Sequence, residues 1–206
     1  MKNVKISTIR CGLLIGISLL AIQGIAQETF KVQPSSTFSI VGSSNIRDWE
    51  ANAGELTGTV TLSEAFLKKD LPKAGTPIDG VSLQIPVAAI DGGRGETMNG
   101  KIRSALKAES HPKVTYQLTS ATVGSVSDKA QGIFDVSATG KLTIGGVTRD
   151  ITMSLKGQKK ADGSYLFFGS KPMKMSQFEI EAPSALFGQL QTEDDIAIRF
   201  SLEVKK

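Results

Sequence analysis

Cysteine and histidine are nearly absent from this sequence. Its 206 residues include one cysteine, Cys11, and one histidine, His111. A Cys–His nucleophilic pair and the usual zinc sites need several such side chains close together, so both are excluded. Cys11 precedes an apolar run instead of following it, which argues against a lipid-modified cysteine. The sequence therefore predicts no metal, no cofactor and no disulfide in the mature chain.

The motifs of common catalytic sites are also missing. Neither a Gly-x-Ser-x-Gly elbow, a Gly-x-Gly-x-x-Gly pattern nor a P-loop occurs. We interpret Ser164 as a turn residue. We interpret the glycines of 91–97 as residues that let the chain pass from a strand into a helix, and a phosphate-binding loop is the alternative for this segment. Glu193, Asp194 and Asp195 are expected in a solvated loop, with a calcium site as the alternative. A catalytic carboxylate pair depends on distances and stays open, but the sequence favours a protein that is not an enzyme.

Long hydrophobic runs are confined to the N-terminus. Residues 1–26 combine basic residues, the apolar run "CGLLIGISLLAI" and the small residues Gly24 and Ala26, which is the pattern of a secretory signal. The run is shorter than the ~20 residues needed to span a bilayer, and no later segment is apolar for long enough. We expect cleavage before Gln27 and a periplasmic or secreted protein.

Without this leader, the chain has almost no net charge. The 24 basic and 20 acidic residues give a net charge of +4, and Lys2, Lys5 and Arg10 all lie in the leader. A nearly neutral mature chain gives no argument for nucleic acid as a partner. Residues 27–206 are long enough for one domain, which must be stabilised by its core because it has no disulfide.

Alternation of apolar and polar residues dominates the rest of the chain. This alternation predicts antiparallel strands with one face buried in the core and the other exposed to solvent. The pairs Gly145-Gly146 and Asp162-Gly163 between alternating runs are typical of hairpin turns. The expected strands are 37–42, 55–62, 81–87, 113–122, 132–144, 147–157, 164–170 and 196–204.

About eight one-sided strands close naturally into a barrel, which removes exposed sheet edges. Two segments have helical character, 63–72 with Ser63 as N-cap and 97–112 with an apolar residue every four positions. The predicted fold is therefore all-β, an antiparallel, roughly eight-stranded lipocalin-like barrel with one or two short helices.

His111 stands where the second helical pattern changes to alternation. Pro112 biases it toward extended backbone, so we interpret His111 as the joint between helix and strand. Contact with a ligand at the barrel mouth is the alternative.

Four segments in order resemble the YceI-like domain family. They are "FKVQPSSTFSIVGSSNIRDWEA", "MNGKIRSALKAESHPKVTYQLTSA", "ATGKLTIGGVTRDITMSLKG" and "KMSQFEIEAPSALFGQLQTEDDIAIRF". The resemblance implies an exported lipocalin-like barrel that holds a long polyisoprenoid, with the polar head near the mouth. The chain departs from the commonest pattern in the insertion "LSEAFLKKDLPKAGTPIDG" and in Arg47, where relatives often have histidine.

Small residues on the dry faces, among them Ala138 and Gly140, favour a hollow interior over a filled one. The predicted lipid-lining side chains are Phe38, Ile40, Leu83, Ile85, Val114, Tyr116, Leu118, Met153, Leu155, Ile198 and Phe200, each with plain core packing as the alternative. The predicted rim is Trp49, His111, Met173, Met175, Phe178 and Phe187.

The resulting hypothesis is a carrier or scavenger of a long-chain isoprenoid or similar amphipathic lipid. The alternative is a ligand-free barrel that acts as a periplasmic interaction or stress-protective module. The sequence allows a homodimer in either case.

Overall fold

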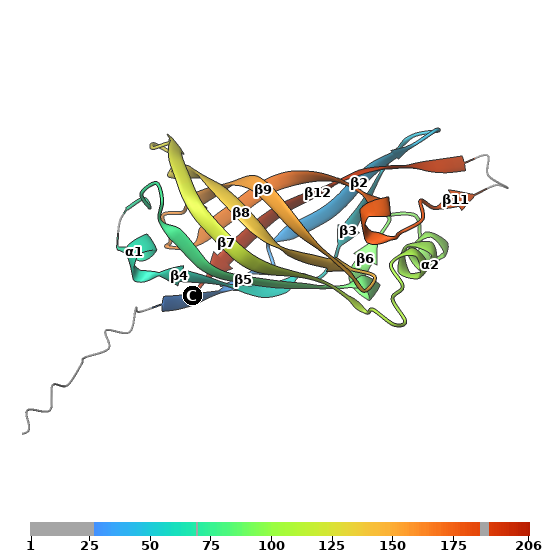
Figure 1. The fold of residues 1–206 in the computed structure, drawn as a ribbon, viewed down its shortest axis with the longest axis horizontal. Coiled ribbons are helices and arrows are strands. Elements are labelled where there is room, and N and C mark those ends of the chain that lie inside the picture. The colour runs from blue at the N-terminus through green and yellow to red at the C-terminus, as the bar shows by residue number, and fades with distance from the viewer. Residues whose placement is uncertain (1–26, 69, 186–189) are drawn as a thin grey trace, which may run out of the picture.

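The computed structural model of this chain describes residues 27–68, 70–185 and 190–206. It is a β-barrel with one short helix at each end (Figure 1). The predicted signal segment, residues 1–26, lies outside the described residues.

Eight antiparallel strands form a closed ring, which confirms the predicted fold class. Each strand pairs with the next, and β1 closes the ring by pairing with β12. In ring order they are β1 (Gln27–Val32), β4 (Thr57–Ser63), β5 (Pro77–Pro86), β7 (Lys113–Asp128), β8 (Ile133–Ile144), β9 (Val147–Lys159), β10 (Tyr165–Lys174) and β12 (Leu190–Lys205).

One edge of β12 is shared by two strands. Its last residues pair with β1, whereas Thr192–Ser201 pair with β2 (Thr37–Ser44). From β2 the sheet continues into β3 (Asp48–Ala53) and β6 (Ile90–Asp91), and the short β11 (Ser184–Ala185) pairs with the start of β12. The predicted strand 37–42 is present as β2, but it lies outside the closed ring, in which β1 takes its place. Alternation alone did not predict β1, because Phe30 is the one buried residue of "QETFKV".

Both helices are shorter than predicted. α1 (Glu64–Leu67) is a single turn in place of 63–72, although Ser63 is its N-cap and accepts a hydrogen bond from the Phe66 N–H at 3.2 Å. α2 (Glu96–Ala105) ends well before Pro112, because Lys107 takes a left-handed backbone with φ of 53°. Two 3-10 turns, η1 (Val87–Ala89) and η2 (Met175–Phe178), complete the fold.

The β8–β9 hairpin confirms the turn prediction. Gly145 and Gly146 have φ of 55° and 85°, and Ile144 pairs with Val147 directly across the turn. A Cβ on Gly146 would lie 2.5 Å from Nε2 of His111, so the imidazole lies directly against this glycine. His111 is thus a joint residue between α2 and β7 that also contacts the hairpin.

Aromatic rings fill the end of the barrel that carries α1. Phe66 of α1 is completely buried and meets Phe134 and Tyr165 edge to face, with ring centroids 5.8 and 5.4 Å apart. Phe30 and Phe167 extend the same cluster. Edge-to-face packing leaves little free space, so this α1 end is closed, and the α2 end lies at the other side of the barrel (Figure 1).

Close packing of this aromatic cluster predicts a large effect at Gly157. A Cβ there would lie 2.3 Å from Cε2 of Phe134, whereas a Cβ on Gly80 would meet the Cβ of Thr61 at an ordinary 3.5 Å. We expect Gly157→Ala to lower the free energy of unfolding by about 1–3 kcal/mol. The control Gly80→Ala should stay within about 0.5 kcal/mol of wild type. Urea unfolding measures both, and equal values for the two variants would contradict the packing described.

A polar network fastens the β9–β10 turn to β12 near this end. The Ser164 hydroxyl and backbone N–H both donate to Asp162, at 2.6 and 3.0 Å, and Lys205 lies 3.2 Å from the same carboxylate. These contacts hold the pKa of Asp162 well below its ordinary 3.8. Hydrogen bonds from Ser35 and Lys160 likewise lower the pKa of Glu203 below 4.5. Ser164 is therefore a turn residue, as predicted.

These lowered pKa values predict acid sensitivity. A carboxyl group whose folded pKa is depressed stabilises the fold above its unfolded pKa and loses that contribution as the pH falls. We therefore expect the free energy of unfolding to decline progressively below about pH 4.5, and the decline to be shallower in Asp162→Asn. Urea unfolding at a series of pH values measures this. An identical pH dependence in wild type and variant would show that Asp162 is not responsible.

Candidate functional site

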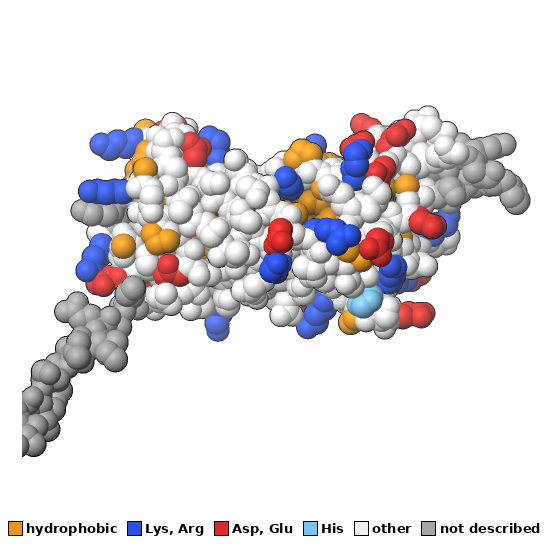
Figure 2. Space-filling model, viewed as in Figure 1, with side chains coloured by type: hydrophobic (Ala, Val, Ile, Leu, Met, Phe, Trp, Pro, Cys, Tyr) orange, Lys and Arg blue, Asp and Glu red, His pale blue; other side chains and the backbone are white. Residues whose placement is uncertain are grey.

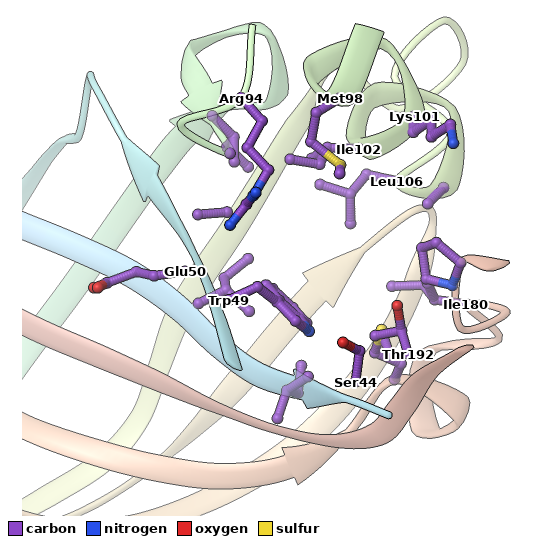
Figure 3. A pocket seen from close by; sticks show the side chains of 18 of the residues that line it. Ser44, Trp49, Glu50, Arg94, Met98, Lys101, Ile102, Leu106, Ile180 and Thr192 are labelled. Atoms are coloured by element: carbon purple, nitrogen blue, oxygen red, sulfur yellow. The ribbon is translucent and has the colours of Figure 1, made fainter. Parts of the chain in front are cut away.

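A cavity of about 170 Å³ opens at the α2 end of the barrel. Its walls come from β2, β3, α2 and β12, with Met175 and Ile180 on one side. We call it the outer cavity, and Figure 3 shows part of its lining. It exists because β2 and β3 diverge from the ring here and α2 covers the resulting gap only in part.

A second cavity of about 100 Å³ lies deeper in the ring. Side chains of β4, β5, β7, β8, β9, β10 and β12 line this inner cavity, and nearly all are apolar. Phe38 and Ile198 line both cavities, so the two spaces adjoin at these side chains. On β12, Ile196 lines the outer cavity and Leu202 lines the inner one. Because a strand rises about 3.3 Å per residue, the two cavities together extend over roughly 20 Å along this strand.

Most of the predicted lipid-lining residues lie at these two cavities. Ile40 and Val114 line the outer one, and Phe38 and Ile198 line both. Those at the inner cavity alone are Leu83, Tyr116, Leu118, Met153, Leu155 and Phe200. Ile85 is an exception: it is buried in the core and lines neither cavity.

The predicted rim is only partly at the opening. Trp49 and Met175 line the outer cavity. Met173 and Phe178 instead pack into the core of the α2 end, since they belong to β10 and η2, whose apolar side chains turn inward there. His111 lies at the α2–β7 joint, outside both linings. Phe187 falls outside the described residues.

Trp49 is held in place by its cross-strand neighbour. It pairs with Gly42 across β2 and β3, and a Cβ on Gly42 would lie 2.4 Å from the indole Cζ2. The indole N–H donates to the carbonyl of Ser43 at 3.1 Å. The indole ring therefore lies against this glycine and lines the outer cavity.

Cationic side chains at the opening are what the sequence analysis missed. Arg47, Arg94 and Lys101 all line the outer cavity. In Figure 3, Arg94 extends from the loop before α2 toward Trp49, whereas Glu50 points away from the cavity. Gly93 and Gly95 on either side of Arg94 have φ of 66° and 74°. The glycine-rich segment is thus a passage into α2, as interpreted, but it also places an arginine at the opening.

Two polar side chains lie along the inner cavity. The hydroxyl of Tyr116 is buried without a hydrogen-bond partner in the described structure, and burial raises its pKa above 10.0. Lys171 of β10 faces the same cavity beside Ile198, its partner on β12. Neither group pairs with the other through any hydrogen bond between described residues.

The ladder between β9 and β10 ends before it reaches Lys171. β9 and β10 share four residue pairs, ending at Phe168 with Lys156, and these two fully described strands then separate. The inner cavity borders the gap, since Met153 and Leu155 line it from one side and Lys171 from the other. Figure 2 shows hydrophobic side chains gathered in a hollow near the middle of one face, with both basic and acidic side chains around it.

The acidic run before the last strand is not a loop, which corrects the prediction. Glu193, Asp194 and Asp195 belong to β12. Asp195 pairs with Lys174 at 2.8 Å, and Asp194 accepts hydrogen bonds from the backbone N–H and hydroxyl of Ser176. No group of three metal-ligating side chains occurs in the described part of the chain, and none of its helices has the length and hydropathy to cross a membrane.

Known structures share this architecture. BcnA of Burkholderia cenocepacia is 20% identical, with a TM-score of 0.66 over 85% of this chain and 99% of its own. A polyisoprenoid binding domain from Saccharophagus degradans, implicated in plant cell wall breakdown, is 16% identical, with a TM-score of 0.61 over 88% of this chain and 99% of its own. The YceI protein of Campylobacter jejuni is 18% identical, with a TM-score of 0.53 over 76% of this chain and 84% of its own. At these identities the likeness establishes the fold.

No curated protein matches the sequence. The model of the YceI-like domain matches residues 30–204, which is nearly all of the described barrel. The chain therefore belongs to the YceI-like domain family.

Proposed function

We propose that this protein is a non-enzymatic carrier or scavenger that holds a long-chain isoprenoid, or a similar amphipathic lipid, inside its barrel. The observation that carries the proposal is the pair of adjoining apolar cavities, closed by aromatic rings at the α1 end and open at the α2 end. The polyisoprenoid binding domain of Saccharophagus degradans shares this fold, which supports the same ligand class.

The size of the cavities decides how such a ligand would fit. A dry apolar cavity of about 150 Å³ holds a benzene-sized molecule, so the outer cavity as it stands takes about one isoprene unit and the inner cavity about one more. At roughly 0.3 kcal/mol per heavy atom, a five-carbon unit contributes about 1.5 kcal/mol. Micromolar binding, about 8 kcal/mol, then needs roughly five or six buried units.

A longer chain therefore requires side chains to move. Phe38 separates the outer from the inner cavity and is itself only half-buried, so it has room to rotate. Met153 is also half-buried and lines the inner cavity, and its flexible thioether side chain can repack around an irregular ligand. We expect ligand uptake to turn the two cavities into one channel.

Export is part of the proposal. The leader pattern of residues 1–26 supports transfer out of the cytoplasm, with cleavage before Gln27 and a periplasmic or extracellular location. N-terminal sequencing of the exported protein would identify the first residue directly.

Chain length should control affinity. Trp49 is the single tryptophan of the sequence and lines the outer cavity, so its fluorescence can follow the titration of lipid-free protein. For prenyl alcohols of increasing length, each added isoprene unit should tighten binding by about tenfold until the interior is full. Affinity that does not change with chain length would contradict burial of the chain.

Filling the inner cavity should block the lipid. Leu118 and Leu83 both line it, so Leu118→Trp and Leu83→Trp place a larger ring where the chain would lie. We expect about a tenfold or greater loss of affinity for a long prenyl alcohol, measured by the same fluorescence titration. Gln117→Trp, at an exposed position of the same strand, adds a second tryptophan as the control and should bind normally. Unchanged binding in both inner-cavity variants, once circular dichroism has confirmed folding, would remove the inner cavity from the site.

A further inference from the structure

The outer cavity differs from the inner one in the charges at its opening. Arg47 comes from the turn between β2 and β3, whereas Arg94 and Lys101 come from the segment that leads into α2 and from α2 itself. The cations thus border the opening from two sides. Figure 3 shows the Arg94 side chain extended toward the cavity.

The side-chain cations at this opening have no partner among the residues that the structure describes. The ion pairs between described residues use other basic side chains, such as Lys141 with Asp150 and Lys174 with Asp195. The side-chain nitrogens of Arg47, Arg94 and Lys101 make no hydrogen bond or ion pair with a described residue, although the backbone of Arg47 is hydrogen-bonded to the Ser44 hydroxyl. Glu50 also lines the cavity but points away from it in Figure 3.

Unpaired cations beside an apolar cavity suit one kind of molecule. A guanidinium group offers several donors in a plane that fits two oxygens of a phosphate or carboxylate. The apolar wall behind it suits a hydrocarbon chain attached to that group. A neutral lipid would use the wall but leave the cations without a function.

We propose that the bound lipid carries an acidic head group, a phosphate or carboxylate, held at the α2 end by Arg94 together with Arg47 and Lys101. Its chain extends past Phe38 into the inner cavity. This inference rests on the proposed function and adds the head-group chemistry and the orientation of the ligand. The exposed position of the cations makes the contribution of each one small and sensitive to salt.

The competing arrangement places the head group at the gap between β9 and β10. Lys171 lines the inner cavity there and also lacks an ion pair among the described residues. It is a single cation, whereas the opening of the outer cavity offers three, so the outer cavity is favoured. Substitution of Lys171 separates the two arrangements.

The test compares farnesyl phosphate and farnesoic acid with neutral farnesol, which has the same chain, by Trp49 fluorescence. We expect both acidic ligands to bind about tenfold more tightly than farnesol. That preference should become smaller in Arg94→Gln and in the double variant Arg47→Gln/Lys101→Gln, disappear when all three substitutions are combined, and shrink with added salt. Lys129→Gln, an exposed and unpaired lysine in the β7–β8 turn, is the matched control and should keep the full preference. Inorganic phosphate alone should bind far more weakly than farnesyl phosphate.

Each other result overturns a defined part of the account. Equal affinity for farnesol and the acidic ligands, with both bound, refutes the acidic head group and leaves the lipid carrier intact. A preference that survives in the Arg94 and double variants but is lost in Lys171→Gln moves the head group to the gap between β9 and β10. If neither farnesol nor the acidic ligands bind, and prenyl alcohols of about five or six isoprene units also fail to bind, the proposed function itself fails.

Discussion

The interior space depends on the way β12 divides one of its edges between two strands. Near its C-terminal end, Val204 pairs with β1, and this pairing closes the ring. Further along the same edge, Phe200 and Ile198 pair with β2, which leads the sheet outward into β3 and β6. The ring is therefore closed along β1, whereas the sheet leads out of the ring along β2. Aromatic side chains fill the first end, and the outer cavity lies at the second.

This asymmetry gives the barrel a direction. Edge-to-face rings around Phe66 seal the α1 end, whereas the α2 end has an apolar cavity with charged groups at its opening. An amphipathic molecule in this space would be stabilised along its chain by burial and at its head by charge. Burial is non-directional and scales with apolar area, so the charges would decide which end enters first. Affinity and orientation would thus come from different parts of the same site.

The strands were predictable because their burial alternates strictly. Along β8, for example, Phe134, Val136, Ala138, Gly140 and Leu142 are all buried, and none of the residues between them is. β1 could not be found in this way, since one buried phenylalanine makes no pattern. The long α2 prediction failed for a local reason: the apolar spacing continues to Leu106, but the left-handed backbone of Lys107 ends the helix.

The sequence predicted which side of each strand faces the interior, but not which of the interior residues border a cavity. Alternation placed Leu83 and Ile85 on the same side of β5, yet only Leu83 borders a cavity, because free space depends on neighbours from other strands. The role of Arg94 was hidden for the same reason. In the sequence, the segment around Arg94 looks only like a connection between a strand and a helix. It borders a cavity because β2 and β3 diverge from the ring beside it.

The proposed ligand places its apolar chain inside the barrel and its head group at the α2 end. The most direct measurement is a crystal structure with a long-chain carboxylic acid that carries bromine on its terminal carbon, located by anomalous scattering. The account predicts a bromine peak in the inner cavity, between Leu118 and Met153, with the carboxylate near Arg94. A peak outside the barrel, or an interior filled by protein side chains with no room for the chain, would contradict it.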